Sequence, residues 1–138
     1  MPTTKTAFYW FSVFAVCSIA YQQIQDNIRP GYSGDNPTIR YFLGVAPNFF
    51  PAIGLPALFI ILLPQIAGKR KTAKWFNEKK HITSNLVALT GLIFWEFLQM
   101  TGNLKFDWND ILWTLLGGFL FHLIWLVSPA KYKSSLLD

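Results

Sequence analysis

Residues 108–127 read WNDILWTLLGGFLFHLIWLV, an apolar stretch whose only charged side chain is that of Asp110. An α-helix rises about 1.5 Å per residue, so a helix of this length crosses the roughly 30 Å hydrocarbon core of a bilayer. Ser128 and Pro129 follow directly and end the helix, because proline is unable to continue it. This stretch therefore predicts a transmembrane helix.

Three further apolar blocks of similar length precede it, at residues 6–24, 48–67 and 81–100. Hydrophobic residues make up 52% of the chain and charged residues only 14%, whereas a soluble domain carries about 25% charged residues. Too little polar surface remains to cover a water-facing globule, and 138 residues suit a single domain. We predict an all-α integral membrane fold, a four-helix transmembrane bundle that forms one domain over residues 1–138.

A cleavable signal peptide is the alternative interpretation of the first block, with Lys5 as its basic start and residues 8–20 as its apolar core. Val16, just before Cys17, is bulky where a lipoprotein-type cleavage site needs a small residue. We expect the block to be retained as a span. A single cysteine forms no internal disulfide and indicates nothing about the redox compartment.

The second block contains two prolines with different expected effects. Asn48 is a plausible N-cap, which would place Pro51 in the first turn, where a missing N–H is harmless. Pro56 falls inside the helix and should kink it. The preceding segment, residues 25–47, predicts turns followed by a short segment on the membrane surface around residues 41–43.

Positive side chains concentrate between the second and third blocks, where residues 69–80 contain six Lys or Arg. Lys and Arg mark cytoplasmic loops. With this loop inside, nine of the twelve Lys and Arg are cytoplasmic, and only three lie outside: Arg29, Arg40 and Lys105. The charge distribution predicts an N-in, C-in orientation.

The same loop, from Lys69 to Lys80, also carries the aromatic residues Trp75 and Phe76. We expect it to hold anionic lipid headgroups, each cation contributing up to about 1 kcal/mol. No basic patch lies away from the predicted membrane surfaces, which argues against nucleic acid as a partner.

Glu96 and Gln99 are the most informative polar residues within a predicted span. They are three residues apart on the third helix and therefore share one face. Glu96 lies about 6 Å below the outer end of that helix. An ionisable group at this depth is unfavourable, so a functional role is the default hypothesis. The alternative is a carboxylate that reaches the headgroups, with Trp95 as interfacial anchor.

Asp107 and Asp110 open the fourth span, where either could cap the helix and complement its positive end. Two carboxylates facing the mouth that contains Glu96 predict a polar cluster at the outer surface. Thr114 lies one turn below Asp110 on the same face, and it also forms a small-residue spacing with Gly118 that favours helix packing. The candidate ligand-binding residues are Glu96, Gln99, Asp107, Asp110 and Thr114.

This part of the sequence resembles a known family. The pattern Glu96-x-x-Gln99, then Phe106-Asp107-x-Asn109-Asp110, then Gly117, is similar to that of the VanZ-like bacterial membrane proteins. The resemblance covers residues 95–122. The family usually has an arginine six residues before the final aspartate, where this chain has Leu104, and it favours asparagine where Thr114 stands.

Membership of that family would imply a protein of the bacterial cytoplasmic membrane and cell envelope, linked to low-level resistance to teicoplanin-type glycopeptides. It would imply no established catalytic reaction. The leading hypothesis is therefore a non-enzymatic envelope protein whose outer polar mouth binds an extracytoplasmic ligand, either a lipid-linked wall precursor, a glycan or a lipid.

Three other functions stay open. One is an accessory structural subunit of a larger membrane complex, with a membrane protein as partner. Another is an intramembrane enzyme with Glu96 and Asp110 as acid and base, although no nucleophile motif or cofactor motif accompanies them. The last is a small drug transporter, but Glu96 lies too near the membrane edge for that role. Carboxylate oxygens could also hold Ca²⁺ or Mg²⁺, yet no loop spacing requires a metal, and we expect none.

The orientation is testable by labelling in intact cells. Single cysteines placed at Ser33 and Thr72 in a Cys17→Ala background should differ in their reaction with an impermeant thiol reagent added outside. We expect labelling at Ser33 only, because the positive loop that contains Thr72 should face the cytoplasm. Labelling at Thr72 without labelling at Ser33 would mean that the orientation is inverted.

Overall fold

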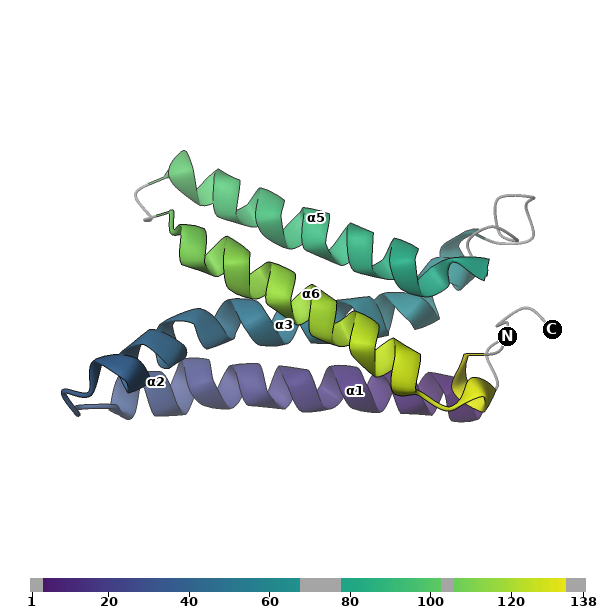
Figure 1. Ribbon diagram of the computed structural model, residues 1–138, viewed down its shortest axis with the longest axis horizontal. Helices are drawn as coiled ribbons and strands as arrows, with labels where there is room; N and C mark the ends of the chain where they lie inside the picture. The colour runs from purple at the N-terminus through teal and green to yellow at the C-terminus, as the bar shows by residue number, and fades with distance from the viewer. Residues whose placement is uncertain (1–3, 68–77, 103–105, 134–138) are drawn as a thin grey trace.

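The computed structural model describes residues 4–67, 78–102 and 106–133. Within these ranges the chain is helical and contains no strand. The first span is built from α1 (Thr4–Gln22), the π-helical η1 (Gln23–Ile28) and the short α2 (Arg29–Gly31). The remaining elements are α3 (Pro37–Ala67), α5 (Lys80–Met100), α6 (Trp108–Val127) and the 3₁₀ turn η2 (Ala130–Tyr132) (Figure 1).

Four of these helical stretches are long and apolar enough to cross a membrane. The predicted all-α fold with four such helices is thus confirmed, and the bounds of α5 and α6 agree with the predicted third and fourth spans. Most of the basic segment expected to hold anionic headgroups, residues 69–77, lies outside the described residues.

The predicted loop at residues 25–47 was wrong, because most of that segment is helical. The first span continues to Gly31 and α3 begins at Pro37, so only residues 32–36 connect them. Asn36 is the residue that caps α3: its Oδ1 accepts hydrogen bonds from the backbone N–H groups of Thr38 and Ile39, at 3.0 and 3.3 Å. Pro37 then occupies the first helical position, where its fixed φ suits the helix.

This early start of α3 also changes the roles of several residues. Asn48 is not an N-cap, and Pro51 is not in a first turn, since both lie inside the helix. The segment expected on the membrane surface is instead part of α3 and contacts α6. Trp113 Nε1 donates to the hydroxyl of Tyr41 at 2.9 Å, and that hydroxyl donates to Asn109 at 3.3 Å.

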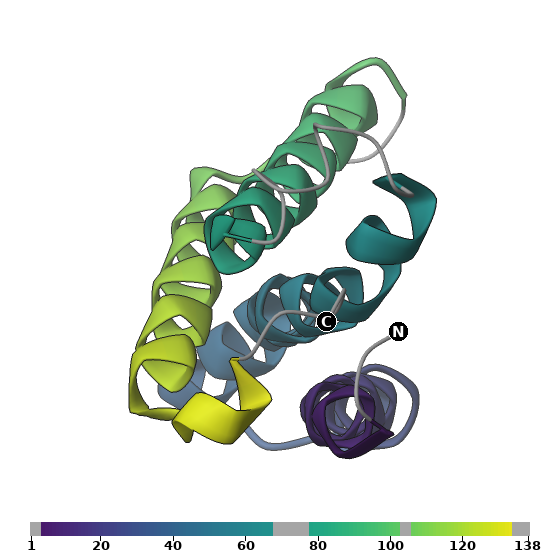
Figure 2. The ribbon, with the colours of Figure 1, turned by 90° about the vertical axis from the view of Figure 1, so that its right-hand side faces the viewer.

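Four internal prolines interrupt the hydrogen bonding of α3: Pro47, Pro51, Pro56 and Pro64. Each lacks the N–H that would bond to the carbonyl four residues earlier, which permits bending. Figure 2 shows α3 bent toward its C-terminal end, so a kinked second span is observed as expected at the sequence level. The π-helical turn before Pro30 has the same cause, because a wider turn accommodates a residue that has no N–H. Its last bond runs from the N–H of Arg29 to the carbonyl of Ile24.

Helix α3 is the centre of the bundle, because it contacts α1, α5 and α6. In Figure 2 it lies between α1 and α5. The core is built around Trp10 and Trp125, whose rings stack with centroids 5.3 Å apart. Trp10 Nε1 also donates to the carbonyl of Tyr132 at 2.9 Å, which fastens the C-terminal turn to the start of α1.

Two adjacent glycines in α6 allow this close packing. A Cβ on Gly117 would lie 2.6 Å from the carbonyl oxygen of Phe49 in α3, and a Cβ on Gly118 would lie 2.8 Å from the Leu89 side chain in α5. Asn85 of α5 donates its Nδ2 hydrogen to the carbonyl of Gly118 at 3.0 Å. Small residues at helix interfaces are the usual means of close approach in membranes.

This contact predicts a large difference between two glycine substitutions. Gly117→Ala should destabilise the fold by about 1–3 kcal/mol, because its Cβ would overlap the Phe49 carbonyl and force α3 and α6 apart. Gly91→Ala in α5 is the matched control, since a Cβ there meets nothing within 4 Å. Unfolding in detergent measures both, and equal stability of the two variants would contradict the packing described.

Candidate functional site

A polar pocket of about 430 Å³ lies at the end of the bundle opposite the start of α1. Four spans contribute its lining, which is rich in amide and charged groups. The lining residues are Tyr21, Gln25, Arg29, Gly44, Pro47, Asn48, Pro51, Leu92, Trp95, Glu96, Gln99 and Asp110.

Helical spacing explains which side chains enter the polar pocket. The first span contributes Tyr21, Gln25 and Arg29, each four residues after the last, so they follow one helix face. The widened turn of η1 lies between Tyr21 and Arg29. Because a π-turn holds more residues than an α-turn, it keeps residues four apart closer to one helix face. Such π-turns are frequent at functional sites.

Glu96 is the most deeply buried polar residue of this pocket, with a side chain only 4% exposed. Gln99, on the same helix, lies within reach of its carboxylate. One carboxylate oxygen, Oε2, is buried and has no hydrogen-bond partner among the described residues. A buried carboxylate oxygen without a donor is unfavourable.

Asp110 lies across the pocket on α6 and is half-buried. Its carboxylate lies within reach of the side chain of Asn48 in α3, and it lies within electrostatic range of both Glu96 and Arg29. The polar pocket thus contains two carboxylates and one guanidinium, with a net charge of −1 when all three are ionised.

The structure brings together three of the five predicted site residues: Glu96, Gln99 and Asp110 all line the polar pocket. Asp107 does not line it. Its carboxylate caps α6 by accepting hydrogen bonds from the backbone and side chain of Asn109, both at 2.9 Å. Thr114 does not line the pocket either, because it is buried, with 1% exposure, in the packing one turn below Asp110.

Residues from the first and second spans were missed at the sequence level, notably Gln25, Arg29 and Asn48. The four-residue spacing of Tyr21, Gln25 and Arg29 could have indicated one continuous helix face, but Gln25 and Arg29 fell within the predicted loop. Asn48 was assigned to a helix cap, and only the observed start of α3 places it on an inward face. A polar residue inside an apolar helix is the signal that could have identified it.

Among residues 4–67, 78–102 and 106–133, no group of three His, Cys, Asp or Glu is placed to share a metal ion. His81 and His122 are neighbours, with ring centroids 5.7 Å apart. They lie near the other end of the bundle, where the His81 ring stacks on Trp125 at 4.6 Å.

Comparison with known proteins finds no family model, no curated protein and no solved structure that matches this chain. The class of protein is therefore defined by the fold alone. Four long apolar helices around a polar pocket at one end are the architecture of a multi-pass membrane protein.

The contact between Asn48 and Asp110 predicts energetic coupling across the pocket. In a double-mutant cycle of Asn48→Ala and Asp110→Ala, we expect a coupling free energy of unfolding of about 1–2 kcal/mol, the range of a charge-assisted hydrogen bond. A second cycle, of Asn48→Ala with Asp107→Ala, is the control and should show little coupling, because Asp107 bonds to Asn109 instead. Similar coupling in both cycles would refute the contact.

Proposed function

We propose that this chain is a VanZ-like envelope protein of the bacterial cytoplasmic membrane, and that its polar pocket opens outward and binds an extracytoplasmic ligand without catalysis. The family assignment rests on the Glu96-x-x-Gln99 and Asp107-x-Asn109-Asp110 pattern. The observation that carries the binding function is the buried carboxylate of Glu96, which lines the pocket and whose Oε2 has no donor among the described residues.

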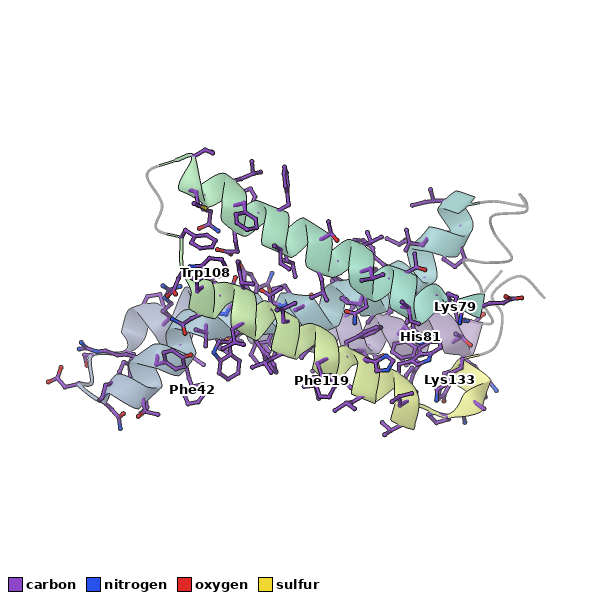
Figure 3. The ribbon with its side chains drawn as sticks, turned by 45° about the horizontal axis from the view of Figure 1, so that its top comes forward. Phe42, Lys79, His81, Trp108, Phe119 and Lys133 are labelled. Atoms are coloured by element: carbon purple, nitrogen blue, oxygen red, sulfur yellow. The ribbon has the colours of Figure 1, made fainter. Side chains whose placement is uncertain are left out.

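The outward direction of the pocket is supported by charge. The end opposite the pocket carries Lys5, Lys79, Lys80, Lys131 and Lys133 of the described chain. The pocket end carries Arg29 and Arg40. Figure 3 shows Lys79 and Lys133 at one end, and Phe42 and Trp108 at the other. Because positive residues favour the cytoplasmic side, the pocket faces out in the N-in, C-in orientation that we propose.

The burial of Glu96 favours a binding site over a carboxylate that reaches the lipid headgroups. A side chain that serves only to reach the interface would be exposed on the outside of the bundle, as neighbouring Trp95 is with 60% exposure. Glu96 instead turns inward with 4% exposure toward the side of the bundle that contains Arg29 and Asp110. Maintaining such a carboxylate lowers stability, which is the usual signature of a residue kept for function.

An accessory subunit of a larger membrane complex is the second candidate. The observation in its favour is the apolar surface of α5, where Phe94, Trp95 and Phe97 are 60%, 60% and 45% exposed. Large exposed aromatics suit a protein partner as well as lipid. A native pull-down analysed for proteins and lipids separates the two candidates, since a stoichiometric protein partner would favour the subunit.

The proposed binding function predicts that Glu96→Gln impairs activity without unfolding the protein. Glutamine is nearly isosteric, so packing is kept while the charge and one acceptor oxygen are lost. In a host where the wild type alters susceptibility to a teicoplanin-type glycopeptide, the variant should lose most of that effect. Its thermal stability should equal or exceed that of the wild type, because an unfavourable buried charge is removed.

Glu78→Gln is the matched control for this experiment. Glu78 is exposed and lies at the opposite end of the bundle, so the same chemical change there should leave susceptibility and stability unaltered. Unchanged susceptibility in the folded Glu96→Gln protein would remove Glu96 from the site. A wild type without any effect on susceptibility would favour the accessory-subunit candidate.

A further inference from the structure

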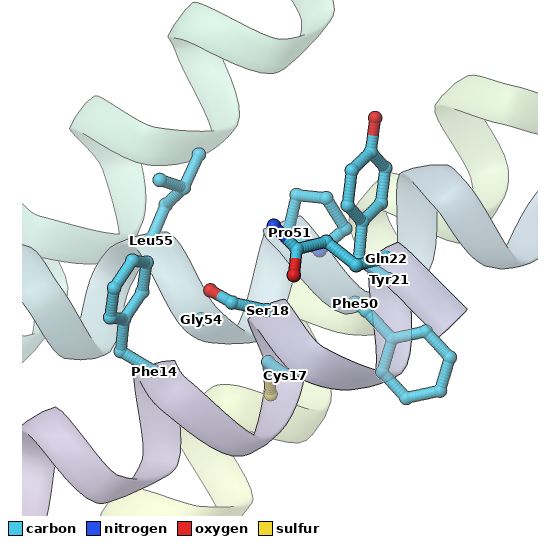
Figure 4. A pocket seen from close by; sticks show the side chains of 9 residues that line it. All are labelled: Phe14, Cys17, Ser18, Tyr21, Gln22, Phe50, Pro51, Gly54 and Leu55. Atoms are coloured by element: carbon cyan, nitrogen blue, oxygen red, sulfur yellow. The ribbon is translucent and has the colours of Figure 1, made fainter. Parts of the chain in front are cut away.

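An apolar groove lies beside the polar pocket, between α1 and α3. It has a volume of about 210 Å³, and Figure 4 shows the side chains that line it. Gly54 forms the part of its wall where the helices are closest: a Cβ there would lie 3.0 Å from the Cβ of Cys17. Phe14 and Leu55 lie together on one side of this point, and both are apolar. The groove therefore offers hydrocarbon-compatible surface at a fixed helix–helix contact.

The groove and the polar pocket are adjacent parts of one surface, because Tyr21 and Pro51 line both. From these shared residues, the groove runs along α1 and α3 toward the middle of the bundle, to Phe14 and Leu55. The polar pocket runs the other way, toward Arg29. A ligand that occupies both would need an apolar chain joined directly to a polar group.

The polar pocket holds groups of both signs on different helices. Arg29 belongs to the same span as one wall of the groove, and its guanidinium donates to Gln25 at 3.3 Å. Glu96 and Asp110 belong to α5 and α6, and α3 lies between α5 and the first span. A ligand that extends from the groove into the polar pocket would therefore meet one cation and two carboxylates.

We propose that the ligand is a phospholipid with a primary-amine headgroup, of the phosphatidylethanolamine type, an inference that rests on the proposed binding function of the polar pocket. One acyl chain lies in the apolar groove, the phosphate pairs with Arg29, and the ammonium pairs with Glu96 and Asp110. Such a lipid combines an apolar chain, a negative phosphate and a positive amine, which are complementary to the apolar groove, the guanidinium and the two carboxylates.

The two carboxylates of the polar pocket select among headgroups. A primary ammonium has N–H groups that can donate to the carboxylates of Glu96 and Asp110, whereas the trimethylammonium of phosphatidylcholine has no N–H to donate. The headgroup of phosphatidylglycerol carries no cation, so it would add a net negative charge beside two carboxylates. A soluble glycan would leave the apolar groove unoccupied.

The test is lipid binding to the purified full chain. The delipidated protein in detergent is titrated with phosphatidylethanolamine, phosphatidylcholine or phosphatidylglycerol of identical acyl chains, and native mass spectrometry measures the bound fraction. We expect the amine lipid to bind about tenfold more tightly than the other two, corresponding to one well-formed charged hydrogen bond.

Three variants test which residues of the protein contact the amine, the phosphate and the acyl chain of the lipid. Glu96→Gln should lower affinity for the amine lipid to that for phosphatidylcholine and leave the latter unchanged. Arg29→Gln should weaken all three lipids, because all three contain the phosphate. Ser18→Phe, which fills the groove at a half-buried position, should also weaken all three while the preference for the amine is kept. Glu78→Gln and Arg40→Gln are the matched controls outside both sites.

Equal affinity of the wild type for the three lipids would overturn this inference, and so would an amine preference that survives in folded Glu96→Gln protein. Neither result depends on glycopeptide susceptibility. If the lipids bind equally but Glu96→Gln still abolishes the susceptibility effect, the lipid inference fails and the proposed function stands. If the amine lipid is selected but the wild type has no effect on susceptibility, the proposed envelope role fails and the lipid site stands.

Discussion

The contact of α6 with the backbone of α3 at Gly117 is the constraint on which the other features depend. At this point a single Cβ would overlap the carbonyl oxygen of Phe49, so the two helices are as close as their backbones allow. Gly118, the next residue, meets α5 in the same way. Because α6 is held against both neighbours, the side chain of Asp110, two turns above, is directed toward Asn48 and Glu96.

The central helix α3 combines an apolar composition with a polar residue at one end. It must be apolar enough to cross a membrane, and it must also present a polar group, Asn48, at one end. Its internal prolines permit bending, and two of them, Pro47 and Pro51, also line the pocket without adding charge. Pro51 lines both the polar pocket and the apolar groove, so the boundary between the polar lining and the apolar lining falls on this residue.

Glu96 is where stability and function oppose each other. Trp10 is well satisfied, because it is fully buried and hydrogen-bonded through its indole nitrogen. Glu96 is buried with one oxygen unpartnered in the described part of the chain, and four other polar atoms of α5 are unpartnered too. Glu96 is the carboxylate among them, and the proposed ligand binding depends on this residue.

Sequence alone determined that the chain is helical and has four helices long and apolar enough to cross a membrane, because apolar length is a local property that needs no knowledge of neighbours. Helical spacing also placed Glu96 and Gln99 on one face, and the short connection to the fourth span brought Asp110 near them. Tertiary structure decided the rest. The early start of α3 follows from the cap at Asn36, and Arg29, Asn48 and the groove join the site only because α1 and α5 lie on opposite sides of α3. These are contacts between residues distant in sequence, and no local pattern encodes them.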